Sequence, residues 1–437
     1  MLAIAVPLLA LGLFVLSLPF IPPSASKRGP VPAVPFWTSF YDVCRGVSRL
    51  QFYKTRLQPL LDKYGAVYVW NAGRWTVMVT KPEYLLRMFR NEDIVAKGGF
   101  YRKIPWGSFA MLFGENIIDS HGPLWVRFAS IIKPGIQKPT DICSLRKKSA
   151  NLAELLLQAQ EGGRPGRGVA IDRLLQRWAV AVYGVAFLDT EIGCLEDGDN
   201  ELEKCIAATK RNIVGPFFAE FPALERFSFL FPSRRRALAA IKRFETLLVG
   251  VVDAWSRKKT NHGPPSPQER EKVVHRLVRA HEQGELSDFH FRSNLKMLTI
   301  AGHENLINRV TLADFTLAPD ITIPRGTWMG WNSYGVHTNP EFWGESATDF
   351  DPLRWGRDIS AVNSLFRLAQ ARGYFIPFNA YMRRCPGSGF ALAQMKVCLV
   401  EMLRRASWTR DPDYHFSTTA RSVLAPKNCR LVFARRG

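Results

Sequence analysis

One cysteine in this sequence stands among residues that would make it a ligand or a reactive thiolate. Cys385 follows Arg383 and Arg384, and Gly387 comes two residues after it. Positive charges and the N–H groups at the start of a helix both favour a thiolate over a thiol. A glycine two residues after the cysteine lets a flat cofactor come close to the backbone. This pattern indicates a thiolate ligand to a heme iron, and the alternative is a buried structural cysteine.

A helix is expected directly after Cys385. Its apolar residues recur at helical spacing, namely Leu392, Met395, Leu399, Met402 and Leu403. Cys398 lies within this helix, and we interpret it as a buried structural cysteine. The chain has seven scattered cysteines and no Cys-x-x-Cys pair. That usage argues against a disulfide scaffold, a zinc cluster, a thioredoxin-type dithiol and a covalently attached heme.

The rest of the chain is predicted to be mostly helical, with a small sheet near each end. Apolar periodicity predicts helices at 146–160, 170–188 and 234–257. Strand-like runs occur at 66–71, 75–80 and 321–331, with turn residues at Gly73 and at 324–326. The basic clusters at 234–236 and 257–259 are interpreted as solvated helix faces.

Composition limits the kind of partner. The 437 residues carry a formal net charge of +21, and 47% of them are hydrophobic, enough for a large core. Such a charge suits nucleic acid, anionic lipid or an acidic protein. No zinc-finger, helix-turn-helix or stacking-aromatic pattern accompanies it, so we expect no nucleic-acid partner.

The N-terminus is predicted to be a membrane anchor. Residues 1–21 contain no charged side chain, and twenty apolar residues span about 30 Å as a helix. A cleaved signal peptide is the alternative, but no basic segment precedes the run. Lys27 and Arg28 follow it, which places the next domain on the cytoplasmic side. We expect a stiff, non-helical, proline-rich hinge at 22–36 and one domain at 37–437.

The loop around Cys385 resembles the heme loop of the cytochrome P450 heme-thiolate family. Phe378, Arg383, Cys385 and Gly387 match its pattern in register, while Tyr381 stands where glycine is usual. The resemblance implies a mainly α cytochrome P450 fold with a small β-rich part and heme b as cofactor. It makes Cys385 the axial ligand of the iron, and Gly387 belongs to the same cofactor-binding loop. Arg383 would pair with a heme propionate, and Phe378 would shield the sulfur.

A second segment, AGHEN at 301–305, resembles the family's oxygen-binding helix. By that resemblance Gly302 makes room for dioxygen and Glu304 supplies protons. Asn305 replaces the usual threonine and is a poorer proton relay. A helix with a polar kink is the alternative interpretation of these residues.

Two further segments resemble parts of the family. Trp125 matches a tryptophan that contacts a propionate, and Arg127 would replace the family's arginine, because Ala129 stands at that position. Residues 342–356 resemble the segment known as the meander, with Arg354 as its arginine.

The family's Glu-x-x-Arg helix has no counterpart between Asn305 and Arg309. We therefore predict an internal deletion of several tens of residues near 305–306. Arg354 would then lack its carboxylate, at a cost of roughly 3–5 kcal/mol for a buried charge, and the chain as written would hold little heme. A truncated gene model or skipped exon is the preferred explanation, and a degenerate, inactive paralogue is the alternative.

The resemblance to fungal microsomal members implies a monooxygenase of the endoplasmic reticulum membrane, acting on an apolar small molecule in secondary-metabolite biosynthesis. Electrons would come from NADPH through NADPH-cytochrome P450 reductase, whose acidic face would meet Arg383, Arg384 and Lys396. Membrane lipid is the other expected partner. The alternatives are a catalytically inactive anchored paralogue and a reductase-independent heme-thiolate isomerase or peroxygenase, although Glu304 favours oxygen activation over isomerisation.

Overall fold

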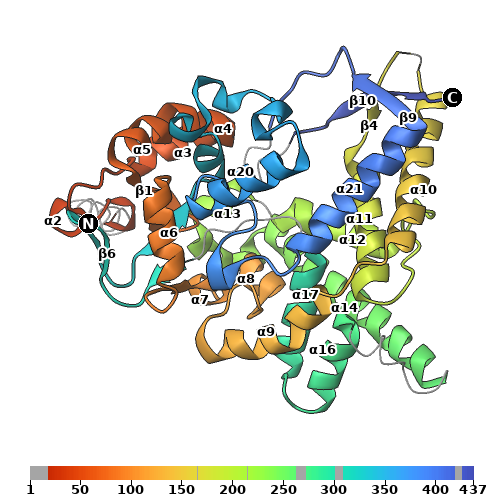
Figure 1. The fold of residues 1–437 in the computed structure, drawn as a ribbon. Helices are drawn as coiled ribbons and strands as arrows, with labels where there is room; N and C mark the ends of the chain where they lie inside the picture. The colour runs from red at the N-terminus through yellow and green to blue at the C-terminus, as the bar shows by residue number, and fades with distance from the viewer. Residues whose placement is uncertain (1–17, 165, 214, 262–271, 301–308, 419–425) are drawn as a thin grey trace, which may run out of the picture. The chain divides into compact units, whose positions relative to one another are not determined.

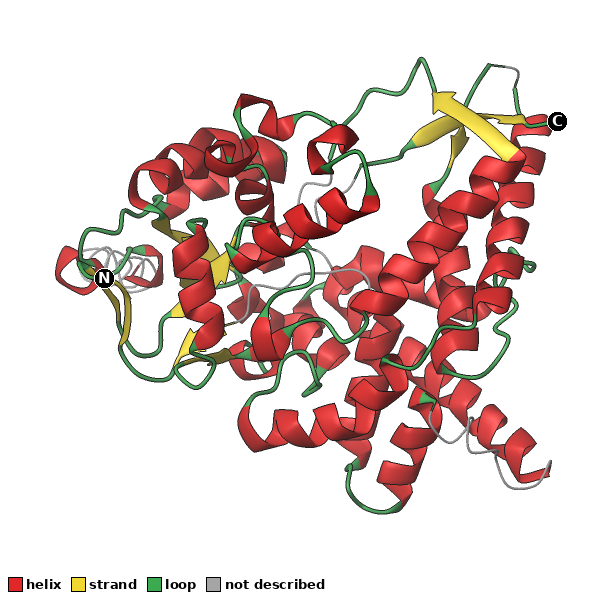
Figure 2. Cartoon of the chain, viewed as in Figure 1, coloured by secondary structure: helices red, strands yellow, loops and turns green. Residues whose placement is uncertain are grey.

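The computed structural model describes residues 18–164, 166–213, 215–261, 272–300, 309–418 and 426–437. The chain forms two compact units. Unit 1 comprises 1–98, 216–223 and 306–385, and unit 2 comprises 99–215, 224–305 and 386–437. Helices dominate the described residues, with three small sheets, as the sequence predicts (Figure 2).

Unit 1 is built on a β-hairpin. Strands β1 (Ala66–Asn71) and β2 (Arg74–Val79) pair antiparallel, from Ala66 opposite Val79 to Asn71 opposite Arg74. The two turn residues, Ala72 and Gly73, both have positive φ, at 48° and 77°. A two-residue turn of this kind matches the twist of the strands, which explains why a glycine lies between the two apolar runs.

The hairpin belongs to a five-stranded sheet of order β1-β2-β8-β5-β3. Its other members are β3 (Val95–Lys97), β5 (Arg309–Thr311) and β8 (Trp328–Trp331), and β8 lies parallel to β2. The predicted strand at 321–331 divides into β7 (Ile321–Ile323) and β8 at the predicted turn. Strands from distant parts of the chain thus share one sheet, in contrast to the expected separate sheet near each end.

The core of unit 1 forms where helix α6 (Pro82–Arg90) packs on this sheet and on the hairpin of β6 (Phe315–Ala318) with β7. Leu85, Met88 and Phe89 from α6 are buried there. The other helical segments of the unit are short and are α2 (Ala25–Arg28), α3 (Phe36–Cys44), α4 (Arg49–Phe52), the π-helical η2 (Tyr53–Leu57), α5 (Gln58–Tyr64), α13 (Pro216–Glu220), α18 (Ser333–His337), α19 (Pro340–Trp343), α20 (Ile359–Ala371) and the 3-10 turns η1 (Leu18–Phe20), η4 (Glu345–Thr348), η5 (Pro352–Trp355) and η6 (Tyr381–Arg383).

The predicted hinge at 22–36 differs from a non-helical spacer. It contains the helical turn α2, and Arg28 closes that turn by donating to the carbonyls of Pro23 and Val31. Val34 donates to the carbonyl of Tyr68 on β1 at 2.9 Å, so the segment packs on the sheet. Within the described ranges, no helix has the length and apolar character needed to cross a bilayer. Residues 1–17, most of the predicted anchor, lie outside those ranges.

Unit 2 contains the longer helices. Helix α10 (Ile142–Glu161) packs against α11 (Asp172–Phe187) and α21 (Ser388–Arg405), as Figure 1 shows. The predicted helices at 146–160, 170–188 and 234–257 are confirmed as α10, α11 and α14 (Pro232–Asn261). The remaining helical segments are α7 (Gly99–Lys103), α8 (Ser108–Phe113), α9 (Gly122–Ile136), α12 (Glu201–Ile213), α16 (Val273–Glu282), α17 (Asp288–Ile300) and η3 (Pro222–Leu230), most of which lies in this unit, and the strands are β4 (Val169–Ala170), β9 (Ala406–Arg410) and β10 (Arg430–Arg435).

The basic cluster at 234–236, predicted to lie on the surface, is partly buried. Arg234, expected on a solvated helix face, is buried and pairs with the buried Glu225 at 3.0 Å. Its guanidinium also donates to the carbonyl of Asn212 at 2.7 Å. The prediction holds for its neighbours Arg235 and Arg236, which are exposed.

Candidate functional site

The cysteine loop follows α20 and ends unit 1. The backbone N–H of Cys385 donates to the carbonyl of Phe378 at 2.8 Å, which folds the loop back on itself. Phe378 and Cys385 are both partly buried. Gly387 is the N-cap of α21, which begins at Ser388, so the predicted helix after the cysteine is confirmed.

Tyr381 occupies the loop position where the pattern usually has glycine. Its φ is +52°, a left-handed conformation that costs a side-chain-bearing residue roughly 1–2 kcal/mol. Arg90 at the end of α6 donates to the Tyr381 hydroxyl at 2.7 Å and lies over its ring, 5.3 Å from the centroid. These two contacts offset the strain, which explains how a tyrosine is tolerated where the backbone suits glycine.

Arg383 points inward rather than to solvent. Its side chain is 4% exposed, and its Nε lies 3.5 Å from Oε1 of Glu92. The other oxygen of Glu92 is 2.5 Å from Nη1 of Arg309, whose side chain is fully buried on β5. One carboxylate therefore lies between two buried guanidinium groups, and one of these belongs to the residue two positions before Cys385.

This cluster fits an anionic group in addition to Glu92. Arg309 also donates to the carbonyl of Val95 at 2.7 Å, but its Nε and Nη2 have no hydrogen-bond partner among the described residues. Burial lowers the pKa of Arg309, and the Glu92 carboxylate opposes that shift. A buried cationic donor of this kind suits a carboxylate such as a heme propionate. Sequence reasoning missed Arg309 and Glu92, because neither lies in a recognisable motif.

The segment that leads into the loop is held by His337. The N–H of Ile376 donates to its Nε2 at 3.0 Å, so this nitrogen is unprotonated. Burial lowers the pKa of His337 to about 4. The imidazole is thus neutral at physiological pH and acts as a fixed acceptor near the start of the loop.

Arg354 does not carry the energetic cost that was expected for a buried charge without its carboxylate. It is partly exposed rather than buried, and its Nη2 donates to the carbonyl of Ser346 at 2.6 Å and of Asp349 at 3.3 Å. Nη1 lies 3.4 Å from the carbonyl of Trp343. Backbone carbonyls thus satisfy the guanidinium, so the cost of a buried unpaired charge does not apply to Arg354.

Comparison with known proteins decides the family. Cytochrome P450 monooxygenase xanG of Aspergillus fumigatus is 36% identical over an alignment that covers 89% of this chain and 84% of the relative. The chain belongs to the cytochrome P450 family. The family model itself matches residues 304–433, and Cytochrome P450-DIT2 of Saccharomyces cerevisiae is 26% identical over 92% of both chains. Membership makes this P450 a monooxygenase and implies heme iron as its cofactor.

The P450 fold is confirmed by a solved structure. The cytochrome P450DA heme domain superposes with a TM-score of 0.70 at 16% identity, covering 94% of this chain and 98% of the other. The sequence alignment with xanG extends over 454 positions, more than the 437 residues of the chain. Since 89% of the chain is about 389 residues, about 65 aligned positions fall opposite gaps in this P450.

The remaining predicted site residues fall into two groups. Trp125 and Arg127 lie on α9 of unit 2, where Arg127 is exposed and the Lys133 ammonium lies 4.4 Å from the Trp125 ring centroid. Gly302, Glu304 and Asn305 lie outside the described residues. The predicted helical run before them, 294–300, is confirmed as the end of α17.

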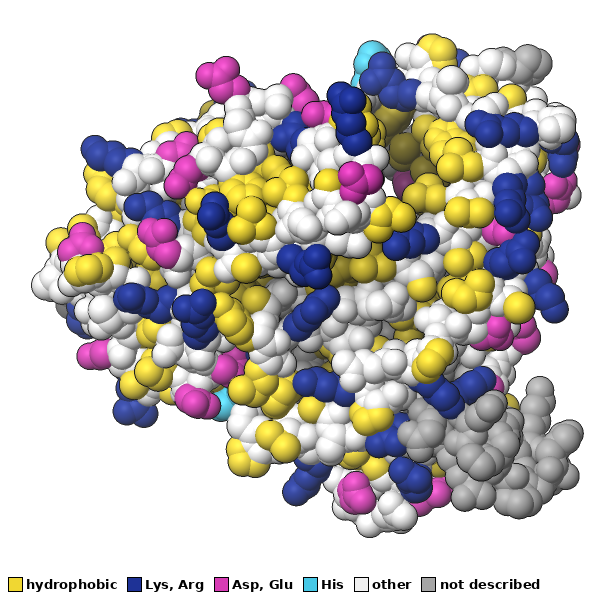
Figure 3. Space-filling model, in the orientation of Figure 1, with side chains coloured by type: hydrophobic (Ala, Val, Ile, Leu, Met, Phe, Trp, Pro, Cys, Tyr) yellow, Lys and Arg dark blue, Asp and Glu magenta, His cyan; other side chains and the backbone are white. Residues whose placement is uncertain are grey.

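Helix α21 has its apolar side chains on an exposed face. Cys398 and Met402 are buried, 7% and 8% exposed, and burial raises the pKa of the Cys398 thiol to about 11, consistent with a structural role. The rest of the predicted stripe is exposed by 39% to 52%, namely Leu392, Met395, Leu399 and Leu403. We call these four residues the outer stripe of α21. Exposed apolar side chains also lie among the Lys and Arg side chains on the face shown in Figure 3.

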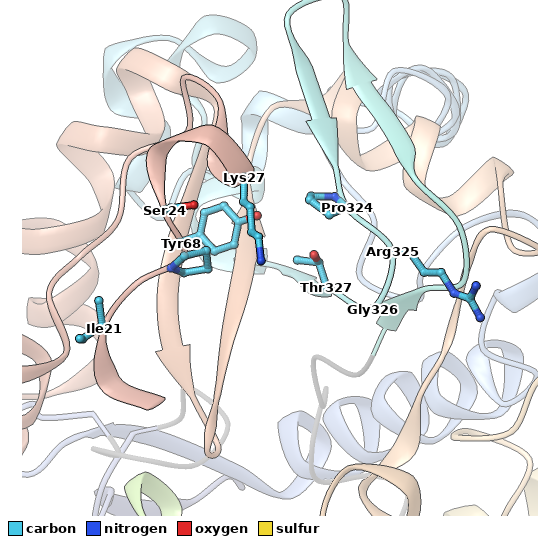
Figure 4. Close-up of a pocket in the computed structure, with 9 residues that line it drawn as sticks. Ile21, Ser24, Lys27, Tyr68, Pro324, Arg325, Gly326 and Thr327 are labelled. Carbon is cyan, nitrogen blue, oxygen red and sulfur yellow. The ribbon is translucent and has the colours of Figure 1, made fainter. Parts of the chain in front are cut away.

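A surface pocket of about 630 Å³ lies in unit 1, away from the loop residues. The lining comes from Ile21, from the predicted hinge, from β1 and from the turn between β7 and β8. In Figure 4 the Lys27 side chain extends beside Tyr68, whereas the Arg325 guanidinium points away. None of the predicted cofactor-binding residues that the structure describes contributes to its lining.

Proposed function

We propose that this P450 is a membrane-anchored heme-thiolate monooxygenase that oxidises an apolar small molecule in fungal secondary metabolism. The observation that carries the proposal is the pair of buried arginines on either side of Glu92, one of which, Arg383, lies two residues before Cys385. The relation to xanG, a fungal monooxygenase, supports the biological setting. Thiolate-ligated heme activates dioxygen for insertion of an oxygen atom into a substrate.

In this proposal Cys385 ligates the iron, and Arg309 and Arg383 hold the propionates. The hydrogen bond from the Cys385 N–H to the carbonyl of Phe378 holds the backbone that carries the proposed ligand. Gly302, Glu304 and Asn305 keep their proposed roles in dioxygen binding and proton delivery.

Electron supply is proposed to come from NADPH-cytochrome P450 reductase. Arg384 and Lys396 are exposed and available for an acidic partner. Arg383 is removed from the expected docking face, because it is buried against Glu92. The docking prediction therefore rests on Arg384 and Lys396.

Replacing the cysteine tests the ligand assignment. Cys385→Ser in heme-loaded protein should abolish the ferrous carbon monoxide band typical of thiolate ligation, because serine does not provide a thiolate. Cys398→Ser is the matched control and should leave the band, since Cys398 is a buried residue of α21. A thiolate band that survives Cys385→Ser would contradict the proposed function.

We also propose that a segment is missing between Asn305 and Leu306. The gaps in the xanG alignment and the outer stripe of α21 support it, because an apolar helix face normally packs against protein. Sequencing the transcript should reveal an in-frame insertion encoding Glu-x-x-Arg on an amphipathic helix. A transcript that reads straight through would favour the inactive paralogue instead.

A further inference from the structure

Among the described residues, two buried guanidinium groups lie beside one carboxylate, that of Glu92, and one of them belongs to the cysteine loop. Arg309 is fully buried, Arg383 is 4% exposed, and both face the single carboxylate of Glu92, which is 12% exposed. Burial of an ionised group is costly unless an opposite charge and hydrogen bonds compensate it. Within the described residues, Glu92 lies within ion-pair distance of both arginines and contributes this compensation to each.

Glu92 also joins three distant parts of the chain. It lies in the loop between α6 and β3, Arg309 lies on β5, and Arg383 ends η6. The Arg309 guanidinium lies 4.9 Å from the ring centroid of Phe89 and donates to the carbonyl of Val95. Arg309 therefore also contacts α6, which precedes the Glu92 loop, and β3, which follows it. Glu92 therefore connects the sheet to the residue two positions before the proposed iron ligand.

We propose that Glu92 is a positioning residue of the heme site. Its carboxylate holds Arg309 and Arg383 in place before the cofactor binds and reduces the positive charge beside the heme afterwards. This inference rests on the proposed function, since it takes heme as the group that the two arginines receive. Two propionates and Glu92 would then face two guanidinium groups, so the carboxylate adds negative charge near the iron and favours the ferric state.

The first arm of the test uses the chain without heme. Glu92→Gln keeps the size of the side chain and removes its charge, so it should lower the urea unfolding midpoint. Glu83→Gln is the matched control, because Glu83 is an exposed carboxylate on the neighbouring α6. Glu92→Asp should recover part of the loss, and so should Glu92→Gln combined with Arg309→Met, which removes the charge left uncompensated. Equal midpoints for Glu92→Gln and Glu83→Gln would overturn the proposal.

The second arm uses protein titrated with hemin, made from the 437-residue chain or, where the transcript contains the extra segment, from its full product. Glu92→Gln should move the ferric–ferrous midpoint potential to more positive values, Glu83→Gln should not, and Glu92→Asp should lie between. A purely structural role would change the unfolding midpoint alone, so an unchanged potential would overturn the electrostatic part. Wild-type protein that takes up no hemin would overturn the proposed function, and with it the cofactor role of Glu92, while the first arm still decides whether Glu92 holds the arginines.

Discussion

His337 makes the approach to the cysteine loop sensitive to acid. Its Nε2 accepts the N–H of Ile376 only in the neutral state, and burial keeps its pKa at about 4, below the ordinary value of 6.5. The unfolded chain binds a proton below about pH 6.5, and the folded chain resists it until about pH 4. The neutral imidazole therefore contributes its full stability above pH 6.5 and loses it as the pH falls to 4.

We expect the free energy of unfolding to fall by up to about 1.4 kcal/mol per pH unit across this window through His337. His337→Gln keeps an acceptor but does not titrate, so its stability should change less with pH between 6.5 and 4. Urea unfolding at several pH values measures both proteins. If the free energies of unfolding of the wild type and of His337→Gln fall in parallel with pH, another group causes the acid sensitivity.

Single residues can be predicted from the sequence where their immediate neighbours form a recognisable pattern. Cys385 and Cys398 differ in their neighbours, and the structure confirms Cys398 as buried. Glu92 and Arg309 could not be found in the same way, because 217 positions separate them and their pairing depends on the tertiary fold. The partial exposure of Arg354 depends equally on the path of the backbone around it.

Helix α21 shows what an element reveals that single residues do not. The apolar spacing correctly predicts the helix, but periodicity cannot say which partner covers each face. One face packs on α10, where the buried Glu401 meets Arg146 at 2.9 Å, and the outer stripe faces solvent. The strands behave similarly, since the run at 75–80 is recognisable as a strand from its composition, but the parallel pairing of this strand, β2, with β8 is not.

Two substitutions on α21 compare the stability contributions of its exposed and buried faces. Leu399→Gln should change the free energy of unfolding of the 437-residue chain by less than about 0.5 kcal/mol, because Leu399 is 52% exposed. Met402→Ala should cost about 2–5 kcal/mol, because Met402 is 8% exposed. Urea denaturation of both variants gives the comparison. A large cost for Leu399→Gln in this chain would mean that the outer stripe is already covered.

For the molecule as a whole, the proposed membrane anchor rests on the charge of the chain and on its N-terminal sequence. The chain has 21 more basic than acidic side chains, and Lys27 and Arg28 are the first charged side chains after the apolar run. Anionic lipid attracts such a surface, and the apolar run would insert.

We expect the protein to remain in the microsomal pellet after carbonate extraction. A glycosylation acceptor placed at its C-terminus should stay unmodified, because the domain would face the cytoplasm. A variant that lacks residues 1–21 is the control and should be released more readily. Recovery of the full chain in the supernatant would contradict the anchor.

The parallel pairing of β2 with β8 has a consequence for biosynthesis. Val79 and Trp331 are partners in the sheet, yet about 250 residues must be translated between them. At roughly 5–20 residues per second, the ribosome needs about 12–50 s to supply β8 after β2 has emerged. During that interval the β1–β2 hairpin has an unpaired edge that can associate with other nascent chains. Yield of soluble protein should therefore depend on chaperones that shield this edge while the rest of the chain is made.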